Sequence, residues 1–203
     1  MNGKFIVIEG GDGVGKGTVV GHLKKVFPET AFVYTREPGG TEVGEKVRDI
    51  LLGCTMVPAT EMLLHFSYRP ELFAQVVLPA VQNGKQVIDE RHIASTYAYQ
   101  IVGRECKDLL PTFLDLERML SKIIAPNLYI YLDLDPKIAA ERLSKSGKVL
   151  DRFELEGEAF HQRVRDGYHE FFKNHRSVIV DANRPPEPIL AEVERIIRNE
   201  TGL

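Results

Sequence analysis

The sequence carries little net charge and only two cysteines. Its 26 lysine and arginine residues stand against 29 aspartate and glutamate residues, which leaves a formal charge of -3. Such a balance provides no general attraction to a polyanion, so we expect no nucleic-acid partner. Cys54 and Cys106 lie far apart and form no CxxC motif, which argues against a metal site or a disulfide.

Long apolar runs, repeats and linkers are also missing. No stretch approaches the length of a membrane span, and a strand-like segment begins almost at the N-terminus, so we expect a cytoplasmic protein with no membrane partner. Without a repeat, a low-complexity tract or a long linker, residues 1–203 are predicted to form a single domain. The chain is 43% hydrophobic, enough to bury a sizeable core.

Short runs rich in valine, isoleucine and tyrosine alternate with helix-length segments. This order predicts parallel strands that are buried on both faces. Helices are expected over 41–52, over 135–143, and after the prolines at 185–188 through residue 197. We therefore predict a three-layer α/β fold with a central five-stranded parallel sheet and a site beyond the carboxyl ends of its strands. The predicted strands are 5–8, 31–35, 86–89, 128–133 and 177–180.

A glycine-rich loop joins the first predicted strand to a helix. Its backbone N–H groups converge at the helix N-terminus to form an anion site, and Lys16 adds a positive charge for a terminal phosphate. Gly17 follows the lysine and Thr18 comes one place later, a variant in which water carries more of the Mg²⁺ coordination. The loop predicts nucleoside triphosphate binding, and the alternative is a glycine-rich turn with a surface lysine. Its residues are Gly10, Gly11, Asp12, Gly13, Val14, Gly15, Lys16, Gly17 and Thr18.

Two further polar segments follow predicted strands. Residues 36–41 read Arg-Glu-Pro-Gly-Gly-Thr, and residues 89–92 read Asp-Glu-Arg-His. Beside a phosphate loop, a carboxylate at a strand end can hold Mg²⁺ through water while a guanidinium binds a phosphate. The alternative is that residues 36–41 form only a turn with a charged pair and that residues 89–92 form only a surface salt bridge.

Five segments in this order and spacing resemble the bacterial-type thymidylate kinase family of P-loop nucleoside monophosphate kinases. They are residues 6–13, 35–41, 95–100, 150–154 and 180–183. Members of that family transfer the γ-phosphoryl group of ATP to dTMP with Mg²⁺. The resemblance therefore implies a P-loop kinase fold, ATP and Mg²⁺ as cofactors, dTMP as the acceptor in dTTP synthesis, and a homodimer.

The resemblance also implies roles for charged residues. Lys16 would hold the β and γ phosphates of ATP, and Arg91 and Arg48 would hold the monophosphate of the acceptor. Asp12 and Glu37 lie where the family organises the acceptor's 3′-hydroxyl and phosphate surroundings.

For the acceptor nucleoside, the resemblance places Tyr99 against the sugar at C2′, which leaves no room for a ribose hydroxyl. Arg69 and Thr96 would hydrogen-bond the edge of a pyrimidine. Ser95 and Gln100 complete the predicted acceptor site.

A short basic segment over about 142–154 is similar to the family's lid. Some relatives carry an arginine in the glycine loop where this chain has Gly13, so Arg152 is expected to reach the transferring phosphate on lid closure. A solvated interhelical loop is the alternative. Arg142 is expected to flank the ATP base together with the loop that holds Asn183 and Arg184.

Two departures from the family pattern leave alternatives open. Relatives have aspartate before the strand-end arginine, whereas this chain has Glu90 with Asp89 one place earlier. Strand alternation allows only one of them to face the metal, and the register favours Glu90, with Thr18 as the other metal residue. Relatives carry a phenylalanine that stacks on thymine where this chain has His65. Either His65 stacks, or the helix shifts to use Phe66, or Phe66 is buried and His65 lies on the helix surface.

Other functions make different demands on the sequence. A P-loop GTPase would need an Asn-Lys-x-Asp stretch, which the chain lacks. A binding module with a vestigial loop is disfavoured by the intact Lys16, Asp12 and Arg91. Within the kinases, His65 favours a second reading, in which the acceptor is dUMP, UMP or a purine nucleotide.

Overall fold

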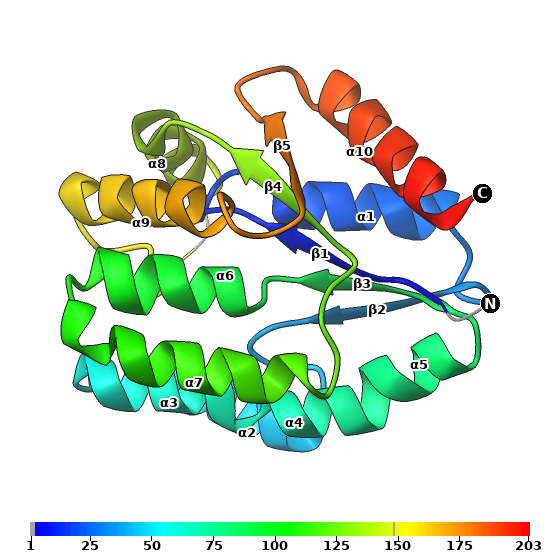
Figure 1. The fold of residues 1–203 in the computed structure, drawn as a ribbon. Helices are drawn as coiled ribbons and strands as arrows, with labels where there is room; N and C mark the ends of the chain where they lie inside the picture. The colour runs from blue at the N-terminus through cyan, green and yellow to red at the C-terminus, as the bar shows by residue number, and fades with distance from the viewer. Residues whose placement is uncertain (1–2, 148) are drawn as a thin grey trace.

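A five-stranded parallel sheet organises the part of the chain that the structure describes, residues 3–147 and 149–203 of a computed structural model. Its strand order is β2-β3-β1-β4-β5, and every pairing is parallel (Figure 1). All five predicted strands are confirmed, each with bounds within one residue of the prediction at either end. The strands are β1 Phe5–Glu9, β2 Phe32–Arg36, β3 Gln86–Glu90, β4 Leu128–Asp133 and β5 Ser177–Asp181.

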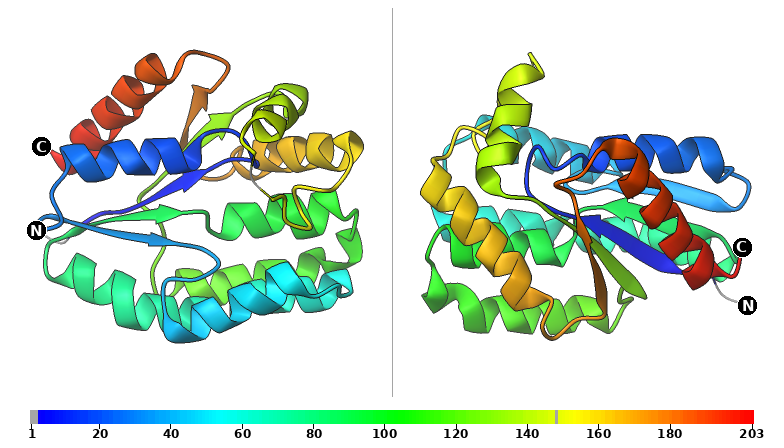
Figure 2. Two further views of the ribbon diagram at one scale, coloured as in Figure 1. Left: turned by 180° about the vertical axis from the view of Figure 1, so that it is seen from behind. Right: turned by 90° about the horizontal axis from the view of Figure 1, so that it is seen from above.

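Helices cover both faces of the sheet. Figure 2 shows α1 and α10 on one side, while α2 to α7 lie together on the other. None of the described helices combines the length and apolar character that a membrane crossing requires. The helices are α1 Lys16–Val26, α2 Glu42–Gly53, α3 Pro58–Ser67, α4 Arg69–Leu72, α5 Leu78–Gln82, α6 Ile93–Thr96, α7 Leu110–Ser121, α8 Pro136–Lys145, α9 Glu158–Phe171 and α10 Pro186–Thr201, with π-helical turns over Phe73–Val77 and Tyr97–Gly103 and a 3₁₀ turn over Lys107–Leu109.

Side-chain caps explain two of the predicted helix starts. The Thr41 side chain accepts a hydrogen bond of 3.0 Å from the Gly44 backbone at the start of α2, and Asp135 caps α8 in the same way. The last helix differs from the prediction because it begins within the proline run, at Pro186, and continues to Thr201. Proline is tolerated in a first helical turn, where no backbone donor is needed, and Gly202 ends the helix with φ 75°.

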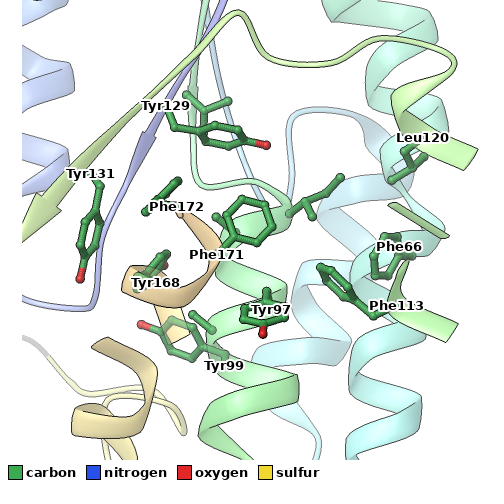
Figure 3. Packing of buried hydrophobic residues seen from close by; sticks show 14 of the residues in the cluster. Phe66, Tyr97, Tyr99, Phe113, Leu120, Tyr129, Tyr131, Tyr168, Phe171 and Phe172 are labelled. Carbon is green, nitrogen blue, oxygen red and sulfur yellow. The ribbon is translucent and has the colours of Figure 1, made fainter. Parts of the chain in front are cut away.

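Each face of the sheet has its own core. Along β1, Phe5 and Val7 pack on one face and Ile6 and Ile8 on the other, all fully buried, as expected for a central parallel strand. Figure 3 shows that the first core is aromatic, built from β4, α9 and the helix that contains Tyr97 and Tyr99. This layer fixes the Tyr168 ring, which stacks on Tyr131 with centroids 4.9 Å apart.

Strand register brings the sequence motifs to the same edge of the sheet. Arg36 pairs with Glu90 across β2 and β3, and Ile8 of β1 also pairs with Glu90. Backbone hydrogen bonds continue past the strand ends, from Glu37 N to Glu90 O and from Arg91 N to Ile8 O. The glycine loop and the two polar segments therefore meet at the predicted place.

The segment predicted to form the lid starts within a helix. The helix α8 extends to Lys145, so residues 142–145 are helical, and the connection to α9 runs from 146 to 157. Lysine and arginine are good helix formers and suit the last turn of a helix, which accounts for the longer α8. Lys148 lies outside the described residues.

Candidate active site

The glycine loop turns tightly between β1 and α1. Gly13 adopts φ 76°, a left-handed conformation that favours glycine, and a Cβ there would lie 2.6 Å from the Ala139 carbonyl oxygen. A side chain at this position would therefore collide with backbone. The structure thus explains why the loop itself carries no arginine.

Lys16 lies at the start of α1 and is 6% exposed. Its Nζ donates to the carbonyl oxygens of Gly10, at 3.0 Å, and Gly11, at 2.7 Å. Burial, together with the nearby charge of Arg91, lowers the pKa of Lys16 to about 8 against the opposing charge of Asp12. A bound anion would relieve this penalty, so the position suits a phosphate.

Arg91 is the central cation of the site. It has φ 71°, a conformation that is uncommon for a residue other than glycine and often marks functional positions. Its guanidinium is held from several elements at once. The partners are the Gly10 carbonyl at 3.0 Å, the hydroxyls of Ser95 at 3.1 Å, Tyr168 at 3.2 Å and Tyr99 at 3.4 Å, and the Asp12 carboxylate.

Asp12 faces Arg91 from the glycine loop. Burial alone would raise its pKa, but the charges of Arg91 and Lys16 outweigh burial and hold the pKa at about 2. Tyr99 donates to the other carboxylate oxygen at 2.7 Å. Asp12 is therefore ionised near neutral pH and fixes both a cation and an aromatic ring.

Glu9, which no sequence motif singled out, stabilises the turn around Arg91. Its fully buried carboxylate accepts from the His92 backbone N–H at 2.7 Å and from the Ser95 hydroxyl at 2.7 Å. These bonds hold the turn that carries Arg91. The available signal was an acidic side chain at the end of the otherwise apolar strand 5–9.

A second buried ion pair lies behind this turn. Arg69 donates from Nε to Glu37 at 2.6 Å and from Nη2 to the Thr96 hydroxyl at 2.9 Å, and both charged side chains are 1% exposed. His92 Nδ1 lies 2.9 Å from the other Glu37 oxygen. Burial would raise the pKa of Glu37, but Arg69 and His92 outweigh it and lower this pKa to about 2. The predicted pair Arg69 and Thr96 is thus brought together.

One cavity of about 520 Å³ joins the glycine loop to the acceptor residues. Its size falls within the usual range for a small-molecule site. Eight of the described residues predicted to form the acceptor or donor site lie off its wall: Gly10, Gly11, Val14, Phe66, Arg69, Thr96, Arg142 and Arg152. The predicted residues on the wall are Asp12, Gly13, Gly15, Lys16, Gly17, Thr18, Glu37, Arg48, His65, Glu90, Arg91, Ser95, Tyr99 and Gln100.

Residues 8–193 match a family model described as Thymidylate kinase. This span includes the glycine loop, both polar segments and the predicted lid. The chain belongs to the thymidylate kinase family.

Relatives from this family are similar over nearly their whole length. A thymidylate kinase of Thiobacillus denitrificans is 37% identical over 205 residues, with 99% of each chain covered. One of Cupriavidus taiwanensis is 40% identical over 204 residues, with 97% of this chain and 98% of the relative covered. The crystal structure of thymidylate kinase from Ehrlichia chaffeensis matches with a TM-score of 0.72 at 26% identity, covering 97% of this chain and 99% of that one. The predicted P-loop kinase fold is confirmed.

The two acidic residues before the strand-end arginine, where the sequence departs from the thymidylate kinase pattern, have different environments. Glu90 is partly exposed on the cavity wall, whereas Asp89 is fully buried and both of its carboxyl oxygens lack a partner among the described residues. Burial raises the pKa of Asp89 well above its usual range, and the charge of Glu37 adds to the shift. Of the two acids, Glu90 alone lies on the wall of this cavity, as the register predicted.

His65 and Phe66, at the second departure from the family pattern, also separate clearly. Phe66 is 3% exposed and packs edge-to-face on Phe113, with ring centroids 5.6 Å apart. His65 lines the cavity, with its ring centroid 6.5 Å from that of Phe153. The alternative that used Phe66 as the stacking ring is not supported by this placement. Burial lowers the pKa of His65 to about 3, with Arg69 adding repulsion, so the imidazole is neutral near pH 7.

The two predicted arginines near the thymidylate kinase lid both have protein partners. Arg142 donates to the Ala182 carbonyl at 3.0 Å, which places it beside the loop that follows β5. Arg152 donates to Glu61 at 2.6 Å and to the Leu51 carbonyl at 2.5 Å, away from the glycine loop. The expected role of Arg152 in transfer stays a prediction, and it requires the guanidinium to leave Glu61.

Proposed function

We propose that this protein transfers the γ-phosphoryl group of ATP to dTMP, giving ADP and dTDP, as a step of dTTP synthesis. The main support for the proposal is that Lys16 and the glycine loop lie on the wall of the same cavity as Arg91 and Arg48. Phosphoryl transfer needs positioning and charge neutralisation rather than covalent chemistry, and this cavity supplies both.

Each charged group has a proposed task. The loop N–H groups and Lys16 hold the β and γ phosphates of ATP, while Arg91 and Arg48 hold the acceptor phosphate. The Arg48 guanidinium is steadied by a hydrogen bond of 3.0 Å to the Pro38 carbonyl. Asp12, ionised and fixed by Arg91, accepts a hydrogen bond from the acceptor sugar.

The residues present also fit a magnesium ion. Thr18 is exposed next to the phosphate loop and Glu90 lies on the cavity wall, so oxygen donors of the kind that Mg²⁺ prefers flank the expected phosphate position. When bound, the ion supplies charge neutralisation at the phosphates. Glu90 would act on it through water.

We also propose that the lid, over about 142–154, closes within a single domain of 1–203, that the enzyme is cytoplasmic, and that it is a homodimer. Large apolar side chains that are 42–50% exposed lie on α2, α3 and α7 or, for Ile123, just after α7, and Figure 1 places these three helices in one layer. They are Val43, Ile50, Leu63, Leu114, Met119 and Ile123. Sedimentation equilibrium at micromolar concentration is expected to give twice the chain mass of 22.9 kDa, and a monomer mass throughout would contradict the dimer.

Substrate choice tests the proposed function. Coupled ADP-release assays with dTMP, dUMP, UMP and dGMP are expected to give the highest kcat/KM for dTMP. The dUMP value should be intermediate, because losing one methyl contact costs roughly 1–3 kcal/mol. UMP should be poor if Tyr99, which its bond to Asp12 holds in place, lies against C2′ of the sugar as the family resemblance implies. A preference for UMP or a purine nucleotide would support the second candidate that His65 favours, while no ADP release with any acceptor would contradict a kinase.

The variant His65→Phe is expected to keep or improve kcat/KM for dTMP, because a larger ring at the same cavity position stacks on the base at least as well as an imidazole. The matched control is Phe66→Leu, which changes a core side chain instead. It should lower stability by about 1 kcal/mol and leave the acceptor KM within about twofold. If His65→Phe had no effect while Phe66→Leu raised the acceptor KM, the stacking assignment would be wrong.

A further inference from the structure

Glu61 of α3 connects the acceptor cavity to the segment 151–156. Its carboxylate is 1% exposed and accepts hydrogen bonds from Gln100 Nε2 at 2.8 Å, Arg152 Nη1 at 2.6 Å and Arg104 Nε at 3.4 Å. Each carboxylate oxygen faces a guanidinium group, Arg104 on Oε1 and Arg152 on Oε2, and a guanidinium can only donate. Both oxygens of Glu61 therefore act as acceptors in these contacts.

This contact decides which way the Gln100 amide points. Because Glu61 only accepts, the NH₂ group of Gln100 must face it, and the amide oxygen must face elsewhere. Gln100 is fully buried on the cavity wall, and its Oε1 has no partner among the described residues. A buried acceptor without a partner is costly, so Gln100 is prepared to receive a donor from a ligand.

Arg69 provides the complementary group nearby. Its Nη2 is bound to Thr96, which lies one helical turn before Gln100, and its Nε is bound to Glu37. Its buried Nη1 has no partner in the described part of the chain. A guanidinium only donates. The two buried groups without a partner among the described residues are therefore one acceptor, Gln100 Oε1, whose direction depends on Glu61, and one donor, Arg69 Nη1.

This pair matches one class of base edge. Thymine and uracil carry an N3–H donor between carbonyl acceptors, whereas cytosine has an N3 acceptor beside a 4-amino donor. We propose that Glu61 is a positioning residue that sets base preference through Gln100, so that the cavity accepts 2,4-dioxopyrimidine nucleotides and rejects cytosine nucleotides. The inference rests on the proposed function in that the acceptor base binds at Gln100.

Binding without ATP tests the inference separately from turnover. Isothermal titration calorimetry of the full chain with dTMP and with dCMP is expected to show a strong preference for dTMP. In the variant Glu61→Gln, the new amide can donate to Gln100, which is then free to reverse. The ratio of the dCMP and dTMP dissociation constants should fall about tenfold or more, because the reversed Gln100 amide can donate to N3 of cytosine, whereas the original orientation accepts from N3–H of thymine.

The matched control is Arg104→Gln, which breaks another Glu61 contact and leaves the Gln100 contact in place. It should leave the ratio of dissociation constants unchanged even where both affinities fall. If Glu61→Gln also left the ratio unchanged, Glu61 would only support the segment 151–156, and the inference would be overturned. Tight dTMP binding without phosphoryl transfer would contradict the proposed function instead.

A measurement on the unmodified protein covers the case in which Glu61→Gln does not fold. The N3-methyl derivative of dTMP lacks the N3–H donor but keeps both carbonyl oxygens. It is expected to bind at least about tenfold more weakly than dTMP, because the Gln100 oxygen then stays without a donor. Equal binding of the two nucleotides would contradict the acceptor role of Gln100.

Discussion

Replacing Lys16 with alanine is expected to lower kcat by about a hundredfold or more while the protein stays folded. The side chain would place a positive charge beside the transferring group, and removing one preorganised donor of this kind costs roughly 10²–10³ in rate. Within the protein it bonds only to the carbonyl oxygens of Gly10 and Gly11 among the described residues, so the fold loses little. Steady-state ADP release with saturating ATP and dTMP measures the effect.

Lys25→Ala is a suitable control for this prediction. Lys25 is exposed in the last turn of the same helix, and its removal should leave kcat within about twofold. Thermal melting of both variants separates loss of chemistry from loss of fold. Near-normal turnover of Lys16→Ala would show that the glycine loop does not hold the donor phosphates.

Arg91→Ala is expected to raise the acceptor KM and lower kcat together. A phosphate that has lost its guanidinium is both weakly held and badly aimed, and a charge-assisted hydrogen bond is worth about 1.5–3 kcal/mol, or roughly 10- to 150-fold. The loss also frees Asp12 and Tyr99 from a shared partner, so the acceptor sugar is held less well. Initial rates over a matrix of ATP and dTMP concentrations separate the two parameters.

Arg152→Ala provides the comparison. If the lid carries Arg152 to the transferring phosphate, this variant should lower mainly kcat. If the bond to Glu61 is its main contribution, the acceptor KM should rise as well, since Phe153 beside it lines the cavity. Should Arg91→Ala and Arg152→Ala change ATP affinity alone, the acceptor and lid roles would both be wrong.

The features that could be predicted from the sequence are those that depend on a few neighbouring residues. Apolar runs fixed the five strands, and the two residues Thr41 and Asp135 marked helix starts that their side chains do cap. The glycine loop was predictable because a tight turn from a strand into a helix requires positive φ angles, which glycine adopts without steric cost. The order of parallel strands then placed all three motifs at one edge.

Long-range side-chain pairing could not be predicted in the same way. Glu9 and Ser95 are 86 positions apart in the sequence, and Glu61 and Arg152 are 91 positions apart. Hydrophobic periodicity predicts helices and strands, but it does not indicate which distant side chains will pair. The Arg152 guanidinium points toward Glu61, a partner that is distant in the sequence. The basic segment 142–154 alone therefore did not predict this direction. The bounds of α8 and α10 also exceeded the prediction, because residues at helix ends are decided by capping and packing more than by pattern.

One competition experiment tests directly whether the protein transfers the γ-phosphoryl group of ATP to dTMP in preference to other nucleoside monophosphates. ATP labelled at the γ-phosphate is supplied with Mg²⁺ and an equimolar mixture of dTMP, dUMP, UMP, dCMP and dGMP, and the labelled nucleoside diphosphates are separated at low conversion. A thymidylate kinase is expected to place most of the label in dTDP, with dUDP next. Label found chiefly in UDP, dCDP or dGDP, or in inorganic phosphate alone, would contradict the proposed transfer to dTMP.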